Sequence, residues 1–213
     1  ILPQKYIFSS DIAKNLNCII IKERGETMEL EDLRKKCLEC ERCKLSKTRK
    51  NVVFGEGSAT ADIMFVGEGP GQTEDETGRP FVGRAGQLLD KYLAAVGLKR
   101  EEVYIANIVK CRPPSNRDPE DFEADECIRF LREQVRLIRP RFIVCLGRVA
   151  ACRLISPDFK VGAQHGKIVT KGGIKFMGTY HPSALLRNPS HRPDAYEDFV
   201  KLYKEYTSSQ NEK

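Results

Sequence analysis

The stretch ADIMFVGEGPG, residues 61–71, decides the fold class of this chain. It begins as an apolar segment with the length of a buried strand and continues without a break into a polar loop rich in glycine. After this loop, apolar side chains recur at helical spacing between residues 85 and 96. The order of strand, loop and helix is the repeating unit of α/β folds.

The same order returns further along the chain. Strands are predicted over residues 102–110, 141–147 and 173–182, and helices over residues 119–138, 148–154 and 194–206. Short apolar strands that alternate with helices favour a parallel sheet with helices on both faces. We therefore expect an α/β fold, a three-layer α/β/α domain around a central, mainly parallel four-stranded sheet. A cysteine-bearing helix that begins near Met28 precedes this domain.

The two ends of the chain are expected to lie outside the packed domain, which spans residues 28–207. Residues 208–213 are expected to fray. Because the chain does not begin with methionine, one hypothesis is that Met28 is the native start and residues 1–27 are translated leader. The alternative is a poorly ordered extension. N-terminal sequencing of the native protein distinguishes the two.

Composition and charge narrow the class of protein. Of the 213 residues, 40% are hydrophobic and 31% are charged, as in a soluble globular domain. No apolar run approaches the roughly 20 residues that a membrane span needs. Lys5, Asp11 and Lys14 interrupt the first residues, which are therefore not typical of a secretory signal. A cytoplasmic location is the expectation, and a net charge of +6 favours a polyanionic partner.

The unusual residues of the chain stand where the predicted strands end. In open parallel sheets, ligands bind outside the carboxyl ends of the strands. Here those ends are residues 67–71, 107–117, 147–148 and 181–188. Asn107 is the lone amide in an otherwise apolar strand, and a buried amide is costly unless it is hydrogen bonded. A ligand site is therefore expected at this edge of the sheet.

The cysteines indicate a metal centre. Disulfides are rare in a reducing cytosol, so some cysteines are expected to bind metal and others to be small buried residues. Residues 37–43, CLECERC, hold two overlapping C-x-x-C pairs, and either pair can place two thiolates on one centre. Cys111 and Cys127 are the natural source of two more ligands. Spacing alone does not choose between zinc and an iron–sulfur cluster. Cys145 and Cys152 are expected to be plain buried residues.

Four motifs carry a resemblance to a known family. They are CERCKLSKTRKNVVFGEG (40–57), GEGPGQTEDETGRPFVGRAGQLLD (67–90), NIVKCRPPSNRDP (107–119) and HPSALLRNP (181–189). Together they closely resemble the family-4 uracil-DNA glycosylases of bacteria and archaea, from about Cys37 through the last helix. The resemblance implies a structural [4Fe–4S] cluster on four cysteines, with Cys37 as an extra one and the register of the overlapping pair left open. Those four are Cys40, Cys43, Cys111 and Cys127.

The resemblance also implies the reaction, which is hydrolysis of the bond between uracil and deoxyribose after the base has left the helical stack. Phe81 is then the stacking platform for the flipped base. Asn107 reads the Watson–Crick edge by donating to uracil O4 and accepting from N3–H. His181 donates a hydrogen bond to uracil O2, and the backbone of Gly69 to Gly71 assists it.

The positioning of the attacking water is the remaining catalytic role. Other uracil glycosylase families carry an aspartate where this chain has Gly69, so the role must move to another residue. Glu68 is the first candidate and Glu74 is the second, with Asp75 as a structural cap. A positioned water and the phosphates of the DNA are a further possibility for a cation-like transition state.

The implied partner is uracil-containing DNA, single- or double-stranded. Leu185, Leu186 and Arg187 are expected to enter the minor groove and fill the space that the base vacates. The proposed phosphate contacts are Lys110, Arg112, Arg117, Arg148 and Arg187. The protein is expected to be a monomer in the cytoplasm, associated with the nucleoid, and a sliding clamp is an open candidate partner.

Two alternatives remain at this stage. Residues 67–72, GEGPGQ, follow a strand and could bind a phosphate in a nucleotide-binding enzyme, although no Walker lysine follows and the G-x-G-x-x-G spacing is missing. The second alternative is a non-catalytic iron–sulfur module that binds nucleic acid. Such a module would have no need for Phe81, Asn107 and His181 to converge on one cavity, so their convergence discriminates between the two.

Overall fold

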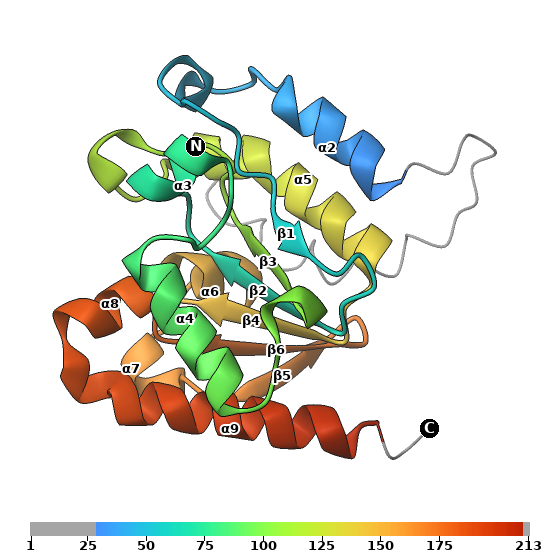
Figure 1. Cartoon of the computed structure of the whole chain (residues 1–213), viewed down its shortest axis with the longest axis vertical. Helices are drawn as coiled ribbons and strands as arrows, with labels where there is room; N and C mark the ends of the chain where they lie inside the picture. The colour runs from blue at the N-terminus through green and yellow to red at the C-terminus, as the bar shows by residue number, and fades with distance from the viewer. Residues whose placement is uncertain (1–28, 211–213) are drawn as a thin grey trace, which may run out of the picture.

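A six-stranded sheet with the order β1-β3-β2-β4-β6-β5 forms the centre of the protein (Figure 1). The computed structural model describes residues 29–210. Four parallel strands occupy the middle, namely β3 (Tyr104–Asn107), β2 (Ile63–Gly67), β4 (Phe142–Leu146) and β6 (Ile174–Thr179). The predicted parallel four-stranded core is therefore confirmed. Two edge strands that the sequence did not predict, β1 (Glu56–Gly57) and β5 (Ile168–Lys171), pair antiparallel with β3 and β6.

Helices cover both faces of the sheet (Figure 1). One face carries α4 (Arg84–Ala95), α8 (Pro182–Arg187) and α9 (Arg192–Ser208), and the other carries α2 (Leu30–Leu38), α5 (Asp121–Ile138) and α6 (Arg148–Leu154). Shorter helices are α3 (Gln72–Thr77) and α7 (Val161–Gln164), and single 3-10 turns are η1 (Lys44–Lys47), η2 (Arg100–Glu102), η3 (Pro114–Asn116) and η4 (Pro189–His191). The three-layer arrangement and the cysteine-bearing helix α2 agree with the sequence prediction.

The alternation of side chains along the strands explains the three layers. In β2, Ile63 and Phe65 point into the cluster that contains α4 and α9, whereas Met64 and Val66 point into the cluster that contains α5. Phe65 stacks on Phe199 of α9 with ring centroids 5.7 Å apart. All residues of β2 are buried, which accounts for the continuous apolar run in the sequence.

The parallel strands place their carboxyl ends at one edge of the sheet. Gly67 of β2 lies beside Asn107 of β3, and Leu146 of β4 lies beside Thr179 of β6. The loops that leave these ends carry the polar residues that the sequence singled out, so this edge is where a ligand site is expected.

The predictions about residues 1–27, including a start at Met28, lie outside the described residues, as do residues 211–213 of the tail. No helix within residues 29–210 is long and apolar enough to cross a bilayer.

Candidate active site

A cavity of about 520 Å³ opens at the carboxyl ends of the parallel strands. Its walls come from the loops after all four of these strands and include Glu68, Phe81, Asn107, Arg148, His181 and Arg187. Gly69 and Gly71 line it as well. The three side chains with predicted roles in base recognition, Phe81, Asn107 and His181, therefore converge on one cavity.

Asn107 presents an unpaired acceptor in this cavity wall. It is the last residue of β3 and is 1% exposed. Its Oδ1 atom is buried and has no hydrogen-bond partner among the described residues. A buried polar atom without a partner costs about 1–3 kcal/mol. Such a cost is expected where the partner is a ligand, because functional sites are where unsatisfied groups occur.

Gly67 allows the carboxamide and the aromatic ring to approach each other. A Cβ atom at position 67 would lie 2.5 Å from Asn107 Oδ1 and 2.5 Å from Phe81 Cζ. Both distances are far below van der Waals contact, so any larger residue would push the two recognition groups apart. Sequence reasoning treated this glycine only as the end of a strand, because Phe81 and Asn107 come close to it only in the folded chain.

Phe81 lies in a loop with an unusual backbone. Its φ angle is +50°, in the left-handed region that bulky residues rarely adopt. The ring centroid lies 5.7 Å from that of His181, with the two planes tilted by 39°. Glu74 Oε1 accepts hydrogen bonds from the backbone N–H groups of Val82 at 2.9 Å and Gly83 at 2.8 Å. Because Glu74 is engaged with this loop, a structural role is favoured over its predicted role in positioning water.

Asp75 has the structural role that the sequence suggested. It is 3% exposed, and its Oδ1 atom accepts hydrogen bonds from the backbone N–H groups of Lys50 at 2.9 Å and Asn51 at 3.3 Å. The carboxylate thus ties α3 to the segment that follows the cysteines.

His181 is held as a neutral imidazole with a defined donor atom. Its Nδ1 accepts a hydrogen bond from the backbone N–H of Ser183 at 3.1 Å and lies 2.8 Å from the Ser183 hydroxyl. Since Nδ1 is an acceptor, the proton of the neutral ring resides on Nε2. Burial, assisted by the positive charge of Arg187, lowers the pKa of His181 to about 4. Ser183 was missed by sequence reasoning, although its place two residues after the histidine at a helix start was a signal.

Comparison with known proteins agrees with this geometry. The family model of the Uracil DNA glycosylase superfamily matches residues 54–205. The chain is 45% identical over 181 residues to a Type-4 uracil-DNA glycosylase of Archaeoglobus fulgidus, which covers 81% of this chain and 91% of that one. The chain belongs to the type-4 family of the uracil-DNA glycosylase superfamily.

Two further relatives place the chain within the superfamily. A Type-4 uracil-DNA glycosylase of Thermotoga maritima is 48% identical over 171 residues, 79% of this chain and 88% of that one. A Type-5 uracil-DNA glycosylase of Pyrobaculum aerophilum is only 36% identical over 146 residues, 61% of this chain and 64% of that one. Among these relatives, the chain is more similar to the type-4 enzymes than to the type-5 enzyme, and over a longer stretch.

In this type-4 family member, five cysteines line a second, much smaller hollow of about 20 Å³ between the start of the domain and α5. They are Cys37, Cys40, Cys43, Cys111 and Cys127. The backbone N–H of Lys110 donates to Cys127 Sγ at 3.2 Å, and Arg49 donates to Cys111 Sγ at 3.3 Å. Such donors stabilise thiolate sulfur, so the set of residues fits a tetrathiolate cluster.

The burial of these cysteines affects how readily their thiols ionise. Within residues 29–210, no group of cysteine, histidine or acidic side chains is spaced closely enough for a single metal ion. Burial raises the pKa of Cys37 and of Cys127 to about 12, so these thiols ionise only beside a cation. Cys145 is buried in β4, as the sequence predicted, whereas Cys152 in α6 is only half-buried, and neither lines the hollow.

Two of the predicted DNA contacts are wrong. Lys110 is 1% exposed, and its ammonium group donates to the Asn107 carbonyl at 2.9 Å and to Gln134 Oε1 at 2.7 Å. Its side chain points inward from the strand end, so it cannot reach a phosphate. Leu185 is also 1% exposed, because α8 packs this residue into the cluster with α4. Leu186 is half-buried and Arg187 is exposed, so both remain candidates for the groove.

The remaining predicted phosphate contacts are arginines. They differ in whether side chains of this protein already bond to their guanidinium groups. Arg117 forms two hydrogen bonds to the buried carboxylate of Glu123, at 2.8 and 2.7 Å, which favours a structural role. Arg112 donates to Asn116 at 2.8 Å and is half-buried. Arg148 is exposed at the cavity and pairs with Asp118. Phosphate contacts at Arg112, Arg148 and Arg187 stay predictions.

The side-chain carboxyl group of Glu68 has a pKa near neutral pH. Burial, assisted by the nearby Asp118 carboxylate, raises the pKa of Glu68 to about 7, against the opposing charges of Arg148 and Arg187. The group is therefore largely protonated below pH 7 and ionised above it. A carboxylate that orients water or stabilises a cation-like sugar acts only in its ionised form.

We expect the rate constant for uracil cleavage to rise as the pH increases from about 6 to about 8, following the ionisation of Glu68. His181 stays neutral across this range because its pKa is about 4, so it adds no slope. Glu68→Gln should flatten the profile in single-turnover measurements. Asp118→Asn should move the rise to lower pH, since it removes the charge that opposes ionisation. An unaltered profile in both variants would contradict the role of Glu68.

Proposed function

We propose that this protein is a DNA repair glycosylase that flips uracil out of DNA and hydrolyses its N-glycosidic bond, which releases free uracil and leaves an abasic site. The unpartnered Oδ1 atom of Asn107 carries the proposal, because it lies in a cavity together with an aromatic ring and a neutral imidazole. The names of the type-4 relatives agree with this activity.

Each recognition group meets a different part of the base. The ring of Phe81 stacks on the uracil face, a contact worth about 1–3 kcal/mol. Asn107 Oδ1 accepts from uracil N3–H, and its amide N–H donates to O4. Cytosine offers an acceptor at N3 and a donor at N4, which is the reverse pattern. The carboxamide therefore selects uracil over the base from which it arises.

The chemistry needs stabilisation of a leaving anion and of a cationic sugar. As the glycosidic bond breaks, negative charge develops on uracil O2, and the Nε2–H of His181 donates to that oxygen. A neutral imidazole suits this role because it gives a hydrogen bond without transferring its proton fully. On the sugar side, Glu68 in its ionised form orients the water and opposes the positive charge.

The cofactor that we propose is a [4Fe–4S] cluster held by Cys40, Cys43, Cys111 and Cys127. When bound, it supplies a structural crosslink and no step of the hydrolysis. The hydrogen bonds from Arg49 to Cys111 Sγ, in the loop after β3, and from the Lys110 backbone to Cys127 Sγ, in α5, support this assignment. The crosslink would hold that loop beside the DNA.

The two alternatives are less favoured. A non-catalytic module does not account for an unpaired acceptor in a cavity that Phe81 and His181 also line. A nucleotide-binding enzyme would need a phosphate near residues 67–72, but the carboxyl groups of Glu68 and Glu74 lie in the same cavity wall and would repel it. Both single- and double-stranded DNA are proposed substrates. A monomeric state, a nucleoid location in the cytoplasm and a sliding-clamp partner stay predictions.

An oligonucleotide incision assay tests the proposal. An end-labelled strand with one deoxyuridine, alone or in a duplex, is incubated with the protein and then heated in alkali to break abasic sites. We expect cleavage at the uracil position without added metal and none in a matched strand with thymidine. Intact deoxyuridine strands in the presence of protein with a full complement of iron would overturn the proposal.

A further inference from the structure

Phe81 needs support from the chain around it because its backbone is strained. A φ angle of +50° is unfavourable for an aromatic residue and persists only when neighbouring contacts hold it. The ring depends on this conformation to lie against Asn107 and His181. The contacts that hold the peptide groups on each side of Phe81 therefore decide where the stacking surface lies.

One side of Phe81 is held by residues of the cavity wall. Glu74 accepts from the N–H groups of Val82 and Gly83, directly after the phenylalanine. Gly86 at the start of α4 completes this side, because a Cβ atom there would lie 1.8 Å from the Phe81 carbonyl oxygen. The loop is thus pressed against the helix with no room for adjustment.

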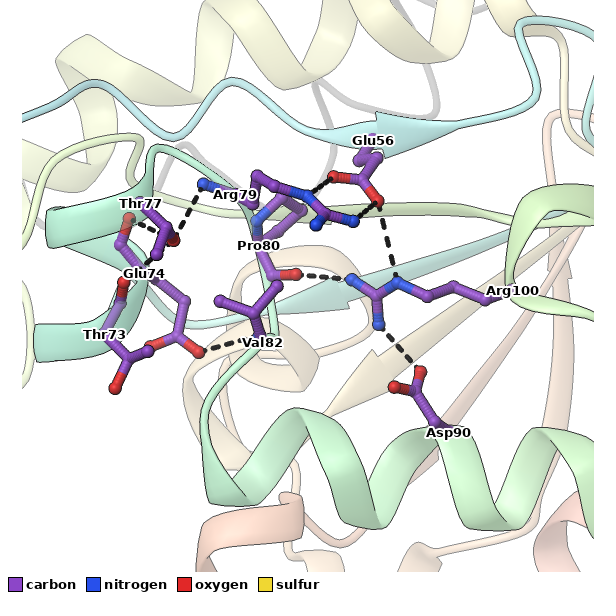
Figure 2. Close-up of polar contacts among 9 residues, drawn as sticks. All are labelled: Glu56, Thr73, Glu74, Thr77, Arg79, Pro80, Val82, Asp90 and Arg100. Atoms are coloured by element: carbon purple, nitrogen blue, oxygen red, sulfur yellow. Dashed lines mark hydrogen bonds and ion pairs between the residues drawn. The ribbon is translucent and has the colours of Figure 1, made fainter.

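The other side of Phe81 is held by an arginine that does not line the cavity. Arg100 of η2 donates from Nη2 to the carbonyl oxygen of Pro80 at 2.5 Å (Figure 2). Its Nη1 donates to Asp90 of α4 at 2.8 Å, and its Nε lies 3.7 Å from Glu56 Oε1. The side chain of Arg100 is only 20% exposed, so the guanidinium is fixed on three sides.

Glu56 links this arginine to a second one in the same network. Arg79 donates two hydrogen bonds to the Glu56 carboxylate, both of 2.7 Å, and its side chain is 60% exposed (Figure 2). Arg79 makes no hydrogen bond to the carbonyl groups that flank Phe81. It therefore offers a matched control, because it shares the ion-pair network without holding the loop.

We propose that Arg100 is a positioning residue for uracil recognition, which holds the Pro80 carbonyl and thereby keeps the ring of Phe81 against the base-reading amide. Asp90 and Glu56 act with it by fixing the plane of its guanidinium. A planar fork that binds a carbonyl and a carboxylate at once is a role that lysine cannot reproduce. This inference rests on the proposed stacking role of Phe81.

The test measures selectivity for uracil rather than activity alone. Single-turnover cleavage is combined with binding to two duplexes, one with a non-cleavable 2′-fluoro-2′-deoxyuridine and one with thymidine at the same place. We expect Arg100→Ala to lower the cleavage rate constant by about 10-fold and to reduce the affinity ratio of the two duplexes by a similar factor. Wild type and Arg79→Ala serve as reference proteins, and their melting temperatures and their binding to the thymidine duplex are measured alongside. Arg79→Ala should retain the wild-type ratio of affinities for the two duplexes.

A double-mutant cycle shows whether Arg100 acts through Phe81. We expect Phe81→Ala to lower cleavage by about 10- to 100-fold, and Phe81→Ala/Arg100→Ala to be no worse than Phe81→Ala. Arg100→Lys, a milder change, should show the same direction of effect. Multiplicative losses in the double variant, or an unchanged affinity ratio in both Arg100 variants, would overturn the inference. If Phe81→Ala cleaves normally, the stacking role itself fails, which is a separate result.

Discussion

Replacement of Asn107 by alanine should lower the single-turnover rate constant for uracil cleavage by at least about 10²-fold, because it removes two hydrogen bonds to the base, each worth about 1.5 kcal/mol. The melting temperature should remain close to that of the wild type. The Oδ1 atom has no partner among residues 29–210, so its removal breaks no internal bond there. Rate constants and thermal melting on the same preparations check both parts.

Asn107→Asp provides the matched control for this prediction. Aspartate has nearly the same shape and keeps an acceptor for N3–H, but an ionised carboxylate cannot donate to uracil O4. Its cleavage rate should therefore also fall steeply, which separates loss of the hydrogen-bond pattern from loss of volume. Wild-type rates in either variant would show that another group reads the base.

Replacement of Cys127 by alanine should abolish the iron content and brown colour expected from the proposed cluster and should reduce the soluble yield. Cys127 of α5 lines the same hollow as Cys111 and the cysteines of residues 37–43. Loss of a shared cluster would therefore free α5, the loop after β3 and residues 37–43 from one another. Iron analysis, the visible absorbance spectrum and thermal melting measure the effect. A colourless but stable variant would limit the cluster to a smaller structural role, and a variant with full iron would exclude Cys127 as a ligand.

Two further sets of variants sharpen this result. Cys145→Ala and Cys152→Ala serve as controls, because neither side chain lines the hollow, and both should retain full iron. Cys37→Ala and Cys43→Ala resolve the register of the overlapping pairs. If Cys40 and Cys43 are the ligands, only Cys43→Ala should lose iron, whereas loss in Cys37→Ala alone would assign the other pair.

The main elements of the fold could be predicted because their apolar patterns are long and buried. The four parallel strands and the helices α4, α5 and α9 have periodic apolar residues that the core requires. The edge strands lack that signal. β1 has two residues, and β5 is mostly half-buried or exposed, so pairing with a neighbour rather than local sequence makes each of them a strand.

Site residues that lie at or after a strand end could be predicted from the sequence. A side chain whose hydrogen-bond partner is distant in the sequence could not. Asn107, Phe81 and His181 meet in one cavity as expected. Lys110 was placed on the surface because lysine is rarely fully buried. Its partner Gln134 lies 24 residues further along the chain, and only tertiary structure brings that amide to the ammonium group.

The glycine that ends β2 has a consequence for attempts to redesign the pocket. Selectivity is usually widened by trimming a side chain that blocks the larger substrate, but Gly67 has no side chain to trim, and it already lies close against Phe81 and Asn107. Room for a bulkier base such as a purine must therefore come from the loop side of the pocket, by replacing Phe81 with a smaller residue or by shifting its loop. An engineer who wants a broader enzyme has to begin there and leave the sheet alone.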